Sequence, residues 1–260
     1  GGLRATKIRH NVGRLELTTL SGLIVGSTWG EGPLLGDADL FELWGEVKAA
    51  VSGDKRLLAA ASAESVQESL KRCRAADSAG FDAVWLAPHR TFAGDAGLQL
   101  LYYQSIADGS PLPVVVGEID RSILPAAEVA KLATHPNVAA ICSGDQPLEH
   151  LSDLLGVSDC APLTSQVLGV VDALAGGIHA AVLPLANVLP FHLLSIEEAV
   201  RTREVDAAGD LERLLESIDA ALARYGVPGL KHAMDLRGYY GGATRLPLRA
   251  LGAEVQAEIA

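Results

Sequence analysis

Several reactive side chains stand at or directly after the ends of apolar runs in the sequence. His89 follows "AVWLAP", Glu118 ends "VVVGE" and Cys142 ends "VAAIC". An imidazole, a carboxylate and a thiol can serve as general base, general acid and nucleophile. Histidine is also the side chain that titrates closest to neutral pH. We therefore predict a catalytic set made of His89, Glu118 and Cys142.

A second group of residues is suited to holding an anion. Ser27 and Thr28 follow "GLIVG", and Arg121 comes three residues after Glu118. Hydroxyl groups and a forked guanidinium bind carboxylate oxygens through hydrogen bonds. We predict that these residues bind a small carboxylate in the same cavity as the catalytic set. Ser27 and Thr28 could instead cap the turn that follows their strand.

Each catalytic candidate also has a structural interpretation. Cys142 could be a buried apolar filler, because a reactive thiolate needs a nearby positive charge and cysteines are commonly buried. His89 could be a loop histidine bonded to a backbone carbonyl. Glu118 could be an ion-pair partner of Arg121 or Arg90. Both interpretations stay open for each residue.

The sequence carries no signature of a metal or cofactor site. Some histidines fall on predicted helices or helix ends without metal-ligand spacing; these are His135, His150, His192 and His232. The three cysteines contain no C-x-x-C pair, which argues against a zinc site and against a disulfide framework. No glycine-rich dinucleotide fingerprint follows any apolar run. We predict that the protein uses no metal and no cofactor.

Bulk composition bounds the class of protein. The chain has 260 residues, of which 49% are hydrophobic and 20% charged, and its net charge is -11. These values are typical of a globular protein with a sizeable core, and the acidic balance argues against a nucleic-acid partner. We recognise no signal-peptide pattern and no apolar run that could span a bilayer, and expect neither to be present. We expect a cytoplasmic protein with a small-molecule ligand and without a membrane partner.

Short apolar runs alternate with amphipathic stretches along the chain. The predicted strands are residues 22–27, 56–62, 83–89, 112–119, 138–144, 160–165 and 180–188, and helices are predicted between them, including one at residues 147–156. Continuous apolar strands alternating with helices indicate a parallel sheet covered on both faces. A (β/α)8 TIM barrel and an open doubly wound sheet both fit, and the missing dinucleotide fingerprint favours the barrel.

The same pattern predicts how the chain is organised. We expect the barrel to span residues 1–194 and a helical C-terminal segment, residues 195–260, to pack on it. The chain opens on the helix-like stretch "RATKIRHNVGRLE" and contains seven predicted strands. A barrel without its first strand would have an open seam with unpaired edges. We therefore expect the first strand to precede Gly1.

The order of several short motifs resembles the dihydrodipicolinate synthase / N-acetylneuraminate lyase family of class I aldolases. The motifs are "GSTWGEGPLL", "LPVVVGEIDR", "HPNVAAIC", "GGIHAAVLPLANVLP" and "GLKHAMDLRGYYGGATRLPL". The resemblance covers nearly the whole chain and implies a TIM barrel with its pocket at the carboxyl ends of the strands. It also implies a homo-oligomer, either a dimer or a tetramer, that acts on a small oxo-acid.

The chain departs from the family at the residues that carry its chemistry. The family's Schiff-base lysine corresponds to Cys142, and its two relay tyrosines correspond to Gly117 and Arg90. A thiol cannot form the protonated imine that serves as the electron sink. The hydroxyl pair persists as Ser27 and Thr28, and Arg121 matches an arginine that binds substrate carboxylates in some members.

No lysine of this chain is an obvious substitute. By the predicted elements, five of the six lysines lie on helices, and Lys55 precedes a strand and so faces the opposite end of the barrel from the expected pocket. Lys231 is the least unfavourable of the six.

Three functional classes therefore remain. The favoured one is a repurposed lyase- or aldolase-like enzyme that acts on a small oxo-acid without Schiff-base catalysis. The others are a catalytically inactive family member that binds a metabolite or a partner protein, and an ordinary pyruvate-dependent lyase with a displaced lysine. The polar replacements His89, Arg90 and Glu118 favour the first class over the second.

Overall fold

The computed structural model of the chain describes residues 2–119, 122–144, 158–178 and 180–260. The chain forms two compact units. The central unit is Leu57–Val182, and the terminal unit combines Gly1–Arg56 with Leu183–Ala260.

The central unit is built on parallel strands. These are β2 (Arg56–Ala60, starting at the unit boundary), β3 (Ala83–Leu86), β4 (Val114–Ile119), β5 (Val138–Ser143), β6 (Ala161–Thr164) and β7 (Ala180–Ala181). Each strand pairs in parallel with the next one along the chain. This sequential order has no switch point of the kind that a doubly wound sheet requires. The prediction of parallel strands is confirmed, and closure into a complete barrel stays a prediction.

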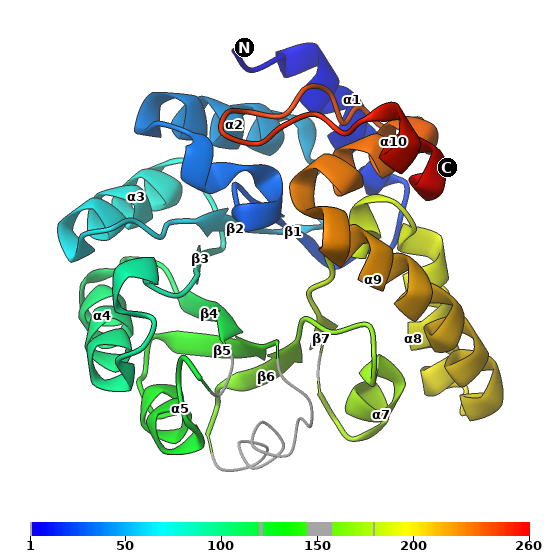
Figure 1. Cartoon of the computed structure of the whole chain (residues 1–260). Helices are drawn as coiled ribbons and strands as arrows, with labels where there is room; N and C mark the ends of the chain where they lie inside the picture. Colours follow the sequence, from blue (N-terminus) through cyan, green and yellow to red (C-terminus); the bar gives the residue numbers. More distant parts are fainter. Residues whose placement is uncertain (1, 120–121, 145–157, 179) are drawn as a thin grey trace. The chain divides into compact units, whose positions relative to one another are not determined.

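Helices follow the strands of this unit. They are α3 (Val66–Ser78), α4 (Ala96–Gly109), α5 (Ala126–Ala133), α7 (Val170–Ala175) and the short 3-10 helix η3 (Arg90–Phe92). Figure 1 shows α3, α4 and α5 along the outside of the curled strands. Side-chain caps begin two of them: Ser65 accepts a hydrogen bond from the Glu68 amide, and Asp95 accepts one from the Leu98 amide. Such caps satisfy amides that a helix start otherwise leaves unbonded.

One face of these strands carries mostly small residues. Strand register pairs Trp85 with Val115, Val115 with Ala140 and Ala140 with Ala161. Paired residues share a face and the next residue along each strand lies on the other face. The opposite face carries large, fully buried aliphatic side chains, among them Val84, Leu86, Val116 and Ile141. Trp85 is the largest side chain on its face, which also carries the small residues Ala60, Ala140 and Ala161 and the larger Leu58 and Leu163.

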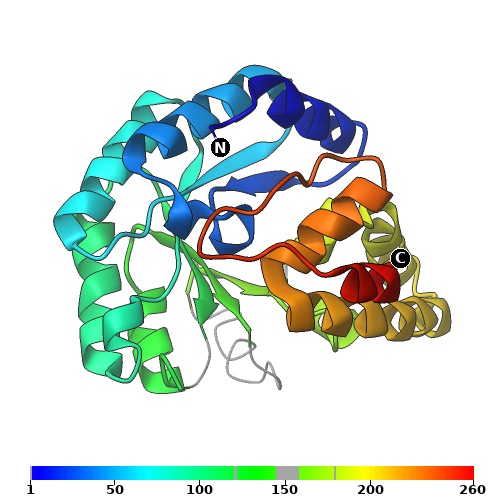
Figure 2. The same ribbon diagram turned by 45° about the horizontal axis from the view of Figure 1, so that its top comes forward.

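The terminal unit contains one strand and most of the remaining helices. Its elements are α1 (Ala5–Glu16), β1 (Gly22–Val25), α2 (Asp37–Ala50), α8 (Pro190–Arg201), α9 (Val205–Leu236), α10 (Ala253–Ile259) and the 3-10 helices η1 (Thr28–Gly30), η2 (Gly32–Leu34) and η4 (Pro184–Asn187). In Figure 2 α8 lies alongside α9, and α10 lies against α9. The predicted helical C-terminal segment is confirmed.

Helix α9 is two helices joined at a kink. Gly226 interrupts it with φ 58° and ψ −147°, and Pro228 follows two residues later. A positive φ favours glycine, and proline has no amide hydrogen to donate within the helix. The sequence "YGVPGL" thus breaks a helix that is otherwise amphipathic.

The two ends of the chain are joined inside the terminal unit. The side-chain Nδ2 of Asn11 donates to the Tyr240 carbonyl at 2.9 Å, and the backbone N–H of Tyr240 donates to Asn11 Oδ1 at 2.7 Å. Arg14 donates to the Gly238 carbonyl at 3.2 Å. Helix α1 is therefore bound to the segment that follows α9.

Two predicted elements differ from the structure or lie outside it. The strand predicted at residues 180–188 is only two residues long, because Pro184 begins the 3-10 helix η4. A proline cannot donate to a strand ladder, so the strand ends before it. The helix predicted at residues 147–156 lies outside the described residues.

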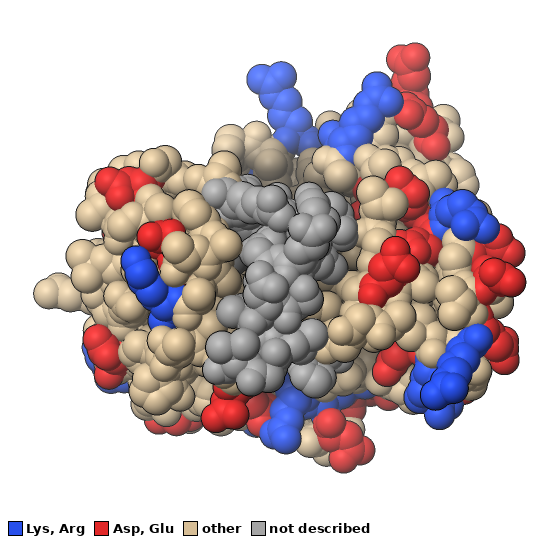
Figure 3. Space-filling model, turned by 90° about the horizontal axis from the view of Figure 1, so that it is seen from below, with Lys and Arg blue, Asp and Glu red and all other residues tan. Residues whose placement is uncertain are grey.

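Charged side chains of both signs are interspersed on the face of the molecule shown in Figure 3. None of the described helices combines the length and the apolar character needed to cross a bilayer.

Candidate functional site

His89 lies three residues beyond the end of β3, and its backbone N–H and carbonyl both form hydrogen bonds with the Gln99 side chain. The His89 amide donates to Gln99 Oε1 at 3.0 Å, and Gln99 Nε2 donates to the His89 carbonyl at 2.6 Å. Gln99 lies on α4 and is fully buried. A buried side chain that pairs with both backbone groups fixes this turn firmly, because each bond is shielded from water.

The imidazole ring of His89 is also fixed, yet one of its nitrogens is left without a partner. Nε2 lies 2.9 Å from the Glu64 carbonyl oxygen, which can only accept, so Nε2 carries the proton. Phe92 stacks on the ring at 4.7 Å, and Tyr102 meets it edge-on at 5.1 Å. Nδ1 is buried and has no hydrogen-bond partner among the described residues. In the neutral ring Nδ1 then holds a lone pair that can accept a proton.

The interpretation of His89 as a loop histidine bonded to a backbone carbonyl is therefore confirmed for Nε2. It does not exclude the catalytic interpretation, because the bond to Glu64 leaves Nδ1 available. The carboxylate of Glu64 lies 3.6 Å from Nε2 and its side chain is 73% exposed, so it is a weak electrostatic partner.

Trp85 fills the space beside Gly117. A Cβ atom built on Gly117 would lie 1.8 Å from Trp85 Cζ2 and 2.2 Å from two further indole atoms. Real Cβ atoms do not approach so closely, so position 117 admits no side chain while Trp85 keeps its place. The indole is 2% exposed, and its Nε1 group is buried with no hydrogen-bond partner among the described residues. Gly117, which the family resemblance aligns with a tyrosine, is thus covered by a tryptophan whose N–H has no partner among the described residues.

Cys142 lies on the same face of the sheet as Trp85. It is the next-to-last residue of β5 and stands two residues after Ala140, which belongs to the Trp85 face. Its side chain is fully buried. Its position near the carboxyl end of β5 agrees with the predicted placement, and its burial favours the interpretation as a filler.

We expect all three cysteines to resist alkylation in the native protein. Cys73 and Cys142 are fully buried and Cys160 is 3% exposed. Burial raises the pKa of the Cys73 thiol, and it raises the pKa of the Cys160 thiol to about 11. A thiol is almost entirely protonated at a pH well below its pKa, and only the deprotonated thiolate reacts with alkylating reagents. Iodoacetamide at pH 8, followed by peptide mass spectrometry, tests this, with the protein unfolded in guanidinium as the positive control.

Rapid labelling of Cys142 alone would contradict this expectation. It would show that the thiol is reached by reagents and would restore its interpretation as a nucleophile.

The remaining predicted residues of this region are described only in part. Glu118 lies in β4, and the structure describes its backbone position but not its side chain. Arg121 lies outside the described residues. Arg90 begins η3 and is exposed. The roles predicted for Glu118 and Arg121 therefore stay predictions.

Ser27 and Thr28 lie in the terminal unit, in a tight turn after β1. The Ser27 carbonyl accepts from the amides of Gly30 and Gly32 at 2.9 and 3.0 Å. A Cβ atom on Gly32 would lie 1.6 Å from the Gly26 carbonyl oxygen, so the turn requires glycine there. Ser27 stands at the N-cap of η1 but its side chain makes no capping bond. The alternative that Ser27 caps the turn is therefore wrong.

A partly buried ion pair also holds this turn. Glu31 adopts a left-handed backbone with φ 59°, and its carboxylate accepts from Lys231 Nζ at 2.8 Å and from the Arg245 amide at 2.8 Å. The Lys231 and Glu31 side chains are 15% and 11% exposed. Lys231 Nζ also donates to the Ala243 carbonyl at 2.8 Å. Sequence reasoning missed Glu31, although it stands in the "GSTWGEGPLL" motif.

The other lysines are engaged by local partners or exposed on helices. Lys71 on α3 pairs with Glu68, and Lys131 on α5 pairs with Glu128, and both ammonium groups are exposed. Lys55 donates to the Thr18 and Leu20 carbonyls. Lys7 lies over the Tyr240 ring, and Lys48 lies exposed on α2. Among the described residues, no cluster of histidine, cysteine or acidic side chains could hold a metal ion.

Sequence comparison finds relatives over nearly the whole chain. The sequence profile described as the dihydrodipicolinate synthetase family matches residues 2–260. A 4-hydroxy-tetrahydrodipicolinate synthase from Teredinibacter turnerae is 31% identical, with 94% of this chain and 86% of that protein covered. An L-threo-3-deoxy-hexylosonate aldolase from Aspergillus niger is 25% identical, with 96% of this chain and 85% of that protein covered.

The fold has close counterparts among solved structures. A dihydrodipicolinate synthase from Bacillus anthracis matches with a TM-score of 0.93 and 22% identity, with 100% of this chain and 91% of that chain covered. A likeness at this level of identity shows a shared fold. It supports the α/β architecture with parallel strands and C-terminal helices described above.

Proposed function

Because the chain belongs to the dihydrodipicolinate synthetase family, we propose that it is an aldolase-like lyase that acts on a small oxo-acid and forms no imine with it. The relatives named above are a synthase and an aldolase, so carbon–carbon bond chemistry is the starting expectation. The observation that carries the proposal is the buried His89 ring with its proton fixed on Nε2 and its Nδ1 lone pair without a partner.

The positions of the lysines support the absence of an imine. Imine formation needs a neutral lysine amine within reach of the substrate carbonyl. Within the central unit the lysines are Lys71 and Lys131, whose ammonium groups stand on exposed helix faces beside glutamates. Lys231 is engaged by Glu31 and by a backbone carbonyl. Each of these ammonium groups therefore already has a partner within the protein.

The proposed chemistry is proton transfer at or beside the oxo group. His89 Nδ1 takes a proton from the carbon next to the carbonyl, and the electron pair of that C–H bond moves into the carbonyl and gives an enolate oxygen. With an aldol as substrate, Nδ1 takes the hydroxyl proton, the O–H electron pair forms the carbonyl of a departing aldehyde, and the carbon–carbon bond breaks with its electron pair moving into the oxo-acid carbonyl to give the same enolate. In the absence of an imine this negative charge requires hydrogen-bond donors. The indole N–H of Trp85 belongs to the same unit as His89 and is a buried donor without a hydrogen-bond partner among the described residues. We propose that it donates a hydrogen bond to the enolate oxygen.

Cys142 and Glu118 have secondary places in this proposal. Cys142 fills space beside the site and does not react, in agreement with its complete burial. Glu118 remains a candidate for returning a proton to the product.

Ser27, Thr28 and Arg121 stay predicted carboxylate-binding residues. The affinities of the Ser27→Ala and Arg121→Ala variants for the oxo-acid test this prediction. A cytoplasmic location and a homo-oligomeric state also remain expectations.

Two measurements on the wild-type protein test the function. We expect deuterium to enter the methyl group of pyruvate, or the corresponding carbon of another 2-oxo acid, when the protein is incubated with the acid in deuterated water and followed by proton NMR. We expect borohydride treatment of the same mixture to leave the intact protein mass unchanged, since no imine is present to be reduced. Borohydride without oxo-acid and oxo-acid without borohydride are the controls.

The outcomes separate the three classes of function. A stable adduct on any lysine would contradict the proposal and indicate an ordinary pyruvate-dependent lyase. Saturable binding of an oxo-acid without exchange or adduct would favour the inactive metabolite-binding alternative. One observation supports that alternative: Trp85 and Cys142 fill the small-residue face of the sheet and are almost completely buried.

A further inference from the structure

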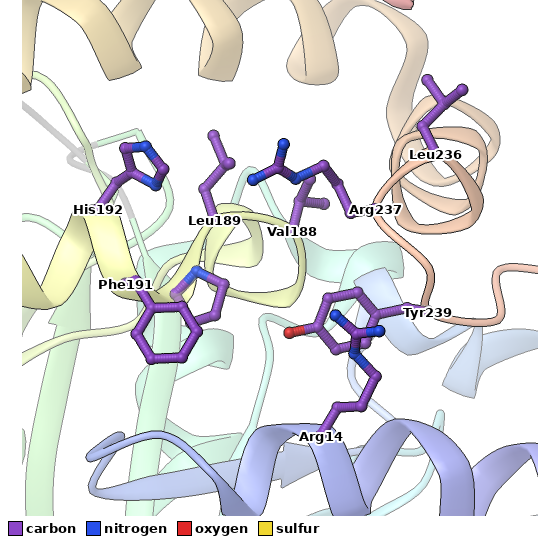
Figure 4. Close-up of a pocket in the computed structure, with 9 residues that line it drawn as sticks. Arg14, Val188, Leu189, Phe191, His192, Leu236, Arg237 and Tyr239 are labelled. Atoms are coloured by element: carbon purple, nitrogen blue, oxygen red, sulfur yellow. The ribbon is translucent and has the colours of Figure 1, made fainter.

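The terminal unit contains a pocket whose lining is basic although the chain is acidic. Its volume is about 290 Å³, and it lies where the start of α8 meets the end of α9 and the α1 residue Arg14 (Figure 4). The basic residues in its lining are Arg14, Arg237 and His192, and the lining includes no aspartate or glutamate. The chain as a whole has 32 acidic and 21 basic residues. The arginines and the histidine of this lining thus have the opposite sign of charge to the net charge of the chain.

The two arginines of this pocket have no carboxylate partner among the described residues. Arg14 donates to the Gly238 carbonyl and lies 4.4 Å above the Tyr239 ring. These contacts hold the guanidinium in place and leave its charge uncompensated. No hydrogen bond or ion pair of the Arg237 guanidinium to a described residue is present. In Figure 4 this guanidinium points toward Leu189, into the space that the lining encloses.

Tyr239 supplies a second and independent indication of a ligand. Its side chain is 8% exposed, and its hydroxyl makes no hydrogen bond with a described residue. Figure 4 shows the hydroxyl pointing toward Phe191, across the same pocket. Most of the ring is buried, but the hydroxyl is not among the fully buried atoms without a partner, so it is accessible from the pocket. A hydroxyl that lacks a hydrogen-bond partner and faces a pocket is suited to bind a ligand oxygen.

The start of helix α8 adds donors of the same kind. Pro190 is the first helical residue, and the N-cap Leu189 has no side chain that could accept from the first turn. The amides of Phe191 and His192 are therefore available, at the end of the helix that carries a partial positive charge. Phe191 is 60% exposed and offers an apolar surface next to these donors.

We propose that this pocket binds a small phosphate monoester, with the phosphate between Arg237, Arg14 and the Tyr239 hydroxyl and the organic part against Phe191. Two guanidinium groups match the charge of a phosphate monoester, which is close to −2 at neutral pH. Three terminal phosphate oxygens can also use the several donors that converge here. A dicarboxylate carries a similar total charge but divides it between two separate groups. The site is independent of the oxo-acid chemistry proposed for the central unit.

Calorimetric titration of the full chain at constant ionic strength tests this site. The probes are phenyl phosphate, inorganic phosphate and succinate. We expect phenyl phosphate to bind more tightly than inorganic phosphate, because only the ester has a ring to place against Phe191, and we expect succinate to bind most weakly. Arg237→Ala should weaken phenyl phosphate binding by about tenfold, the effect of losing one charge-assisted contact at an exposed site. Tyr239→Phe should also weaken it while preserving the ring below Arg14.

Arg201→Ala is the matched control. Arg201 is an exposed arginine at the other end of α8 and is paired with Glu198, so its loss should leave the affinity for phenyl phosphate unchanged. The proposal is overturned if phenyl phosphate shows no saturable binding, or if Arg237→Ala and Arg201→Ala bind it equally well. Tighter binding of succinate than of phenyl phosphate would overturn the assignment of the ligand to phosphate esters.

Discussion

Gly117→Ala is expected to lower the free energy of unfolding by about 3 kcal/mol, at the upper end of the usual range for overpacked cores. The new methyl group would lie 1.8 Å from Trp85 Cζ2. The indole cannot easily move away, because it is 2% exposed in a densely packed interior. Equilibrium unfolding in urea measures the change.

A double-mutant cycle shows whether Trp85 is the cause. Trp85→Leu alone should destabilise the protein, since a large buried ring is lost. On that background Gly117→Ala should have a much smaller effect, with a coupling energy of about 1–3 kcal/mol. Gly45→Ala is the control, because Gly45 lies in helix α2 and a Cβ atom there would meet nothing within 4 Å. Equal effects of Gly117→Ala with and without Trp85 would show that the indole does not occupy this space.

The same contact predicts the effect of placing at position 117 the tyrosine that the family resemblance aligns with it. Gly117→Tyr alone should not fold stably, and a phenol can enter only if Trp85 is also replaced by a small residue. The difference at position 117 is therefore coupled to position 85. Gly117→Tyr without a substitution of Trp85 is therefore not expected to place a phenol in the site.

His89→Gln is expected to lower the rate of deuterium exchange into the oxo-acid by about 10²–10⁴-fold, the usual contribution of a general base. The glutamine amide can still donate to the Glu64 carbonyl, as the imidazole Nε2 does at 2.9 Å. The amide offers no lone pair basic enough to replace Nδ1. Proton NMR gives the exchange rate, and urea unfolding of the same variant shows whether the fold is preserved.

Glu64→Gln provides the matched control for this substitution. The Glu64 carboxylate lies 3.6 Å from His89 Nε2 and its side chain is 73% exposed, whereas the contact that orients the ring comes from the Glu64 backbone. We expect this variant to change the exchange rate only a few-fold, in keeping with a weak surface ion pair. Undiminished exchange in His89→Gln, with the fold intact, would remove His89 from the mechanism.

Periodicity predicted most elements of the fold because buried parallel strands and amphipathic helices leave strong local patterns. The strands that carry Trp85, Gly117 and Cys142 were all predicted, within a few residues at their ends. The seventh strand was predicted too long, because the apolar run "AAVLPLANV" hides the point at which Pro184 ends the pairing. A single proline inside an apolar run is a local signal that outweighs the average of the run.

The candidate site was harder to predict, because its geometry depends on contacts between distant residues. The sequence places His89 after a strand, and that position is confirmed. It does not show that Gln99, ten residues later, would hold its backbone, or that the Glu64 carbonyl would decide which ring nitrogen carries the proton. The contact between Trp85 and Gly117 likewise depends on the register of two strands. Convergence of His89 with Glu118, Arg121 and the Ser27–Thr28 pair stays a prediction.

The bond between Asn11 and Tyr240 has a consequence for how the chain folds during synthesis. The residues of the terminal unit are separated in sequence by the whole of the central unit, Leu57–Val182. A ribosome therefore releases every residue of the central unit before it releases the partner of Asn11. Helix α1 can pack on α2, which follows it in the sequence, but its hydrogen bonds to the segment after α9 form only once that segment has emerged. We expect the central unit to be structured on the ribosome before the terminal unit is complete.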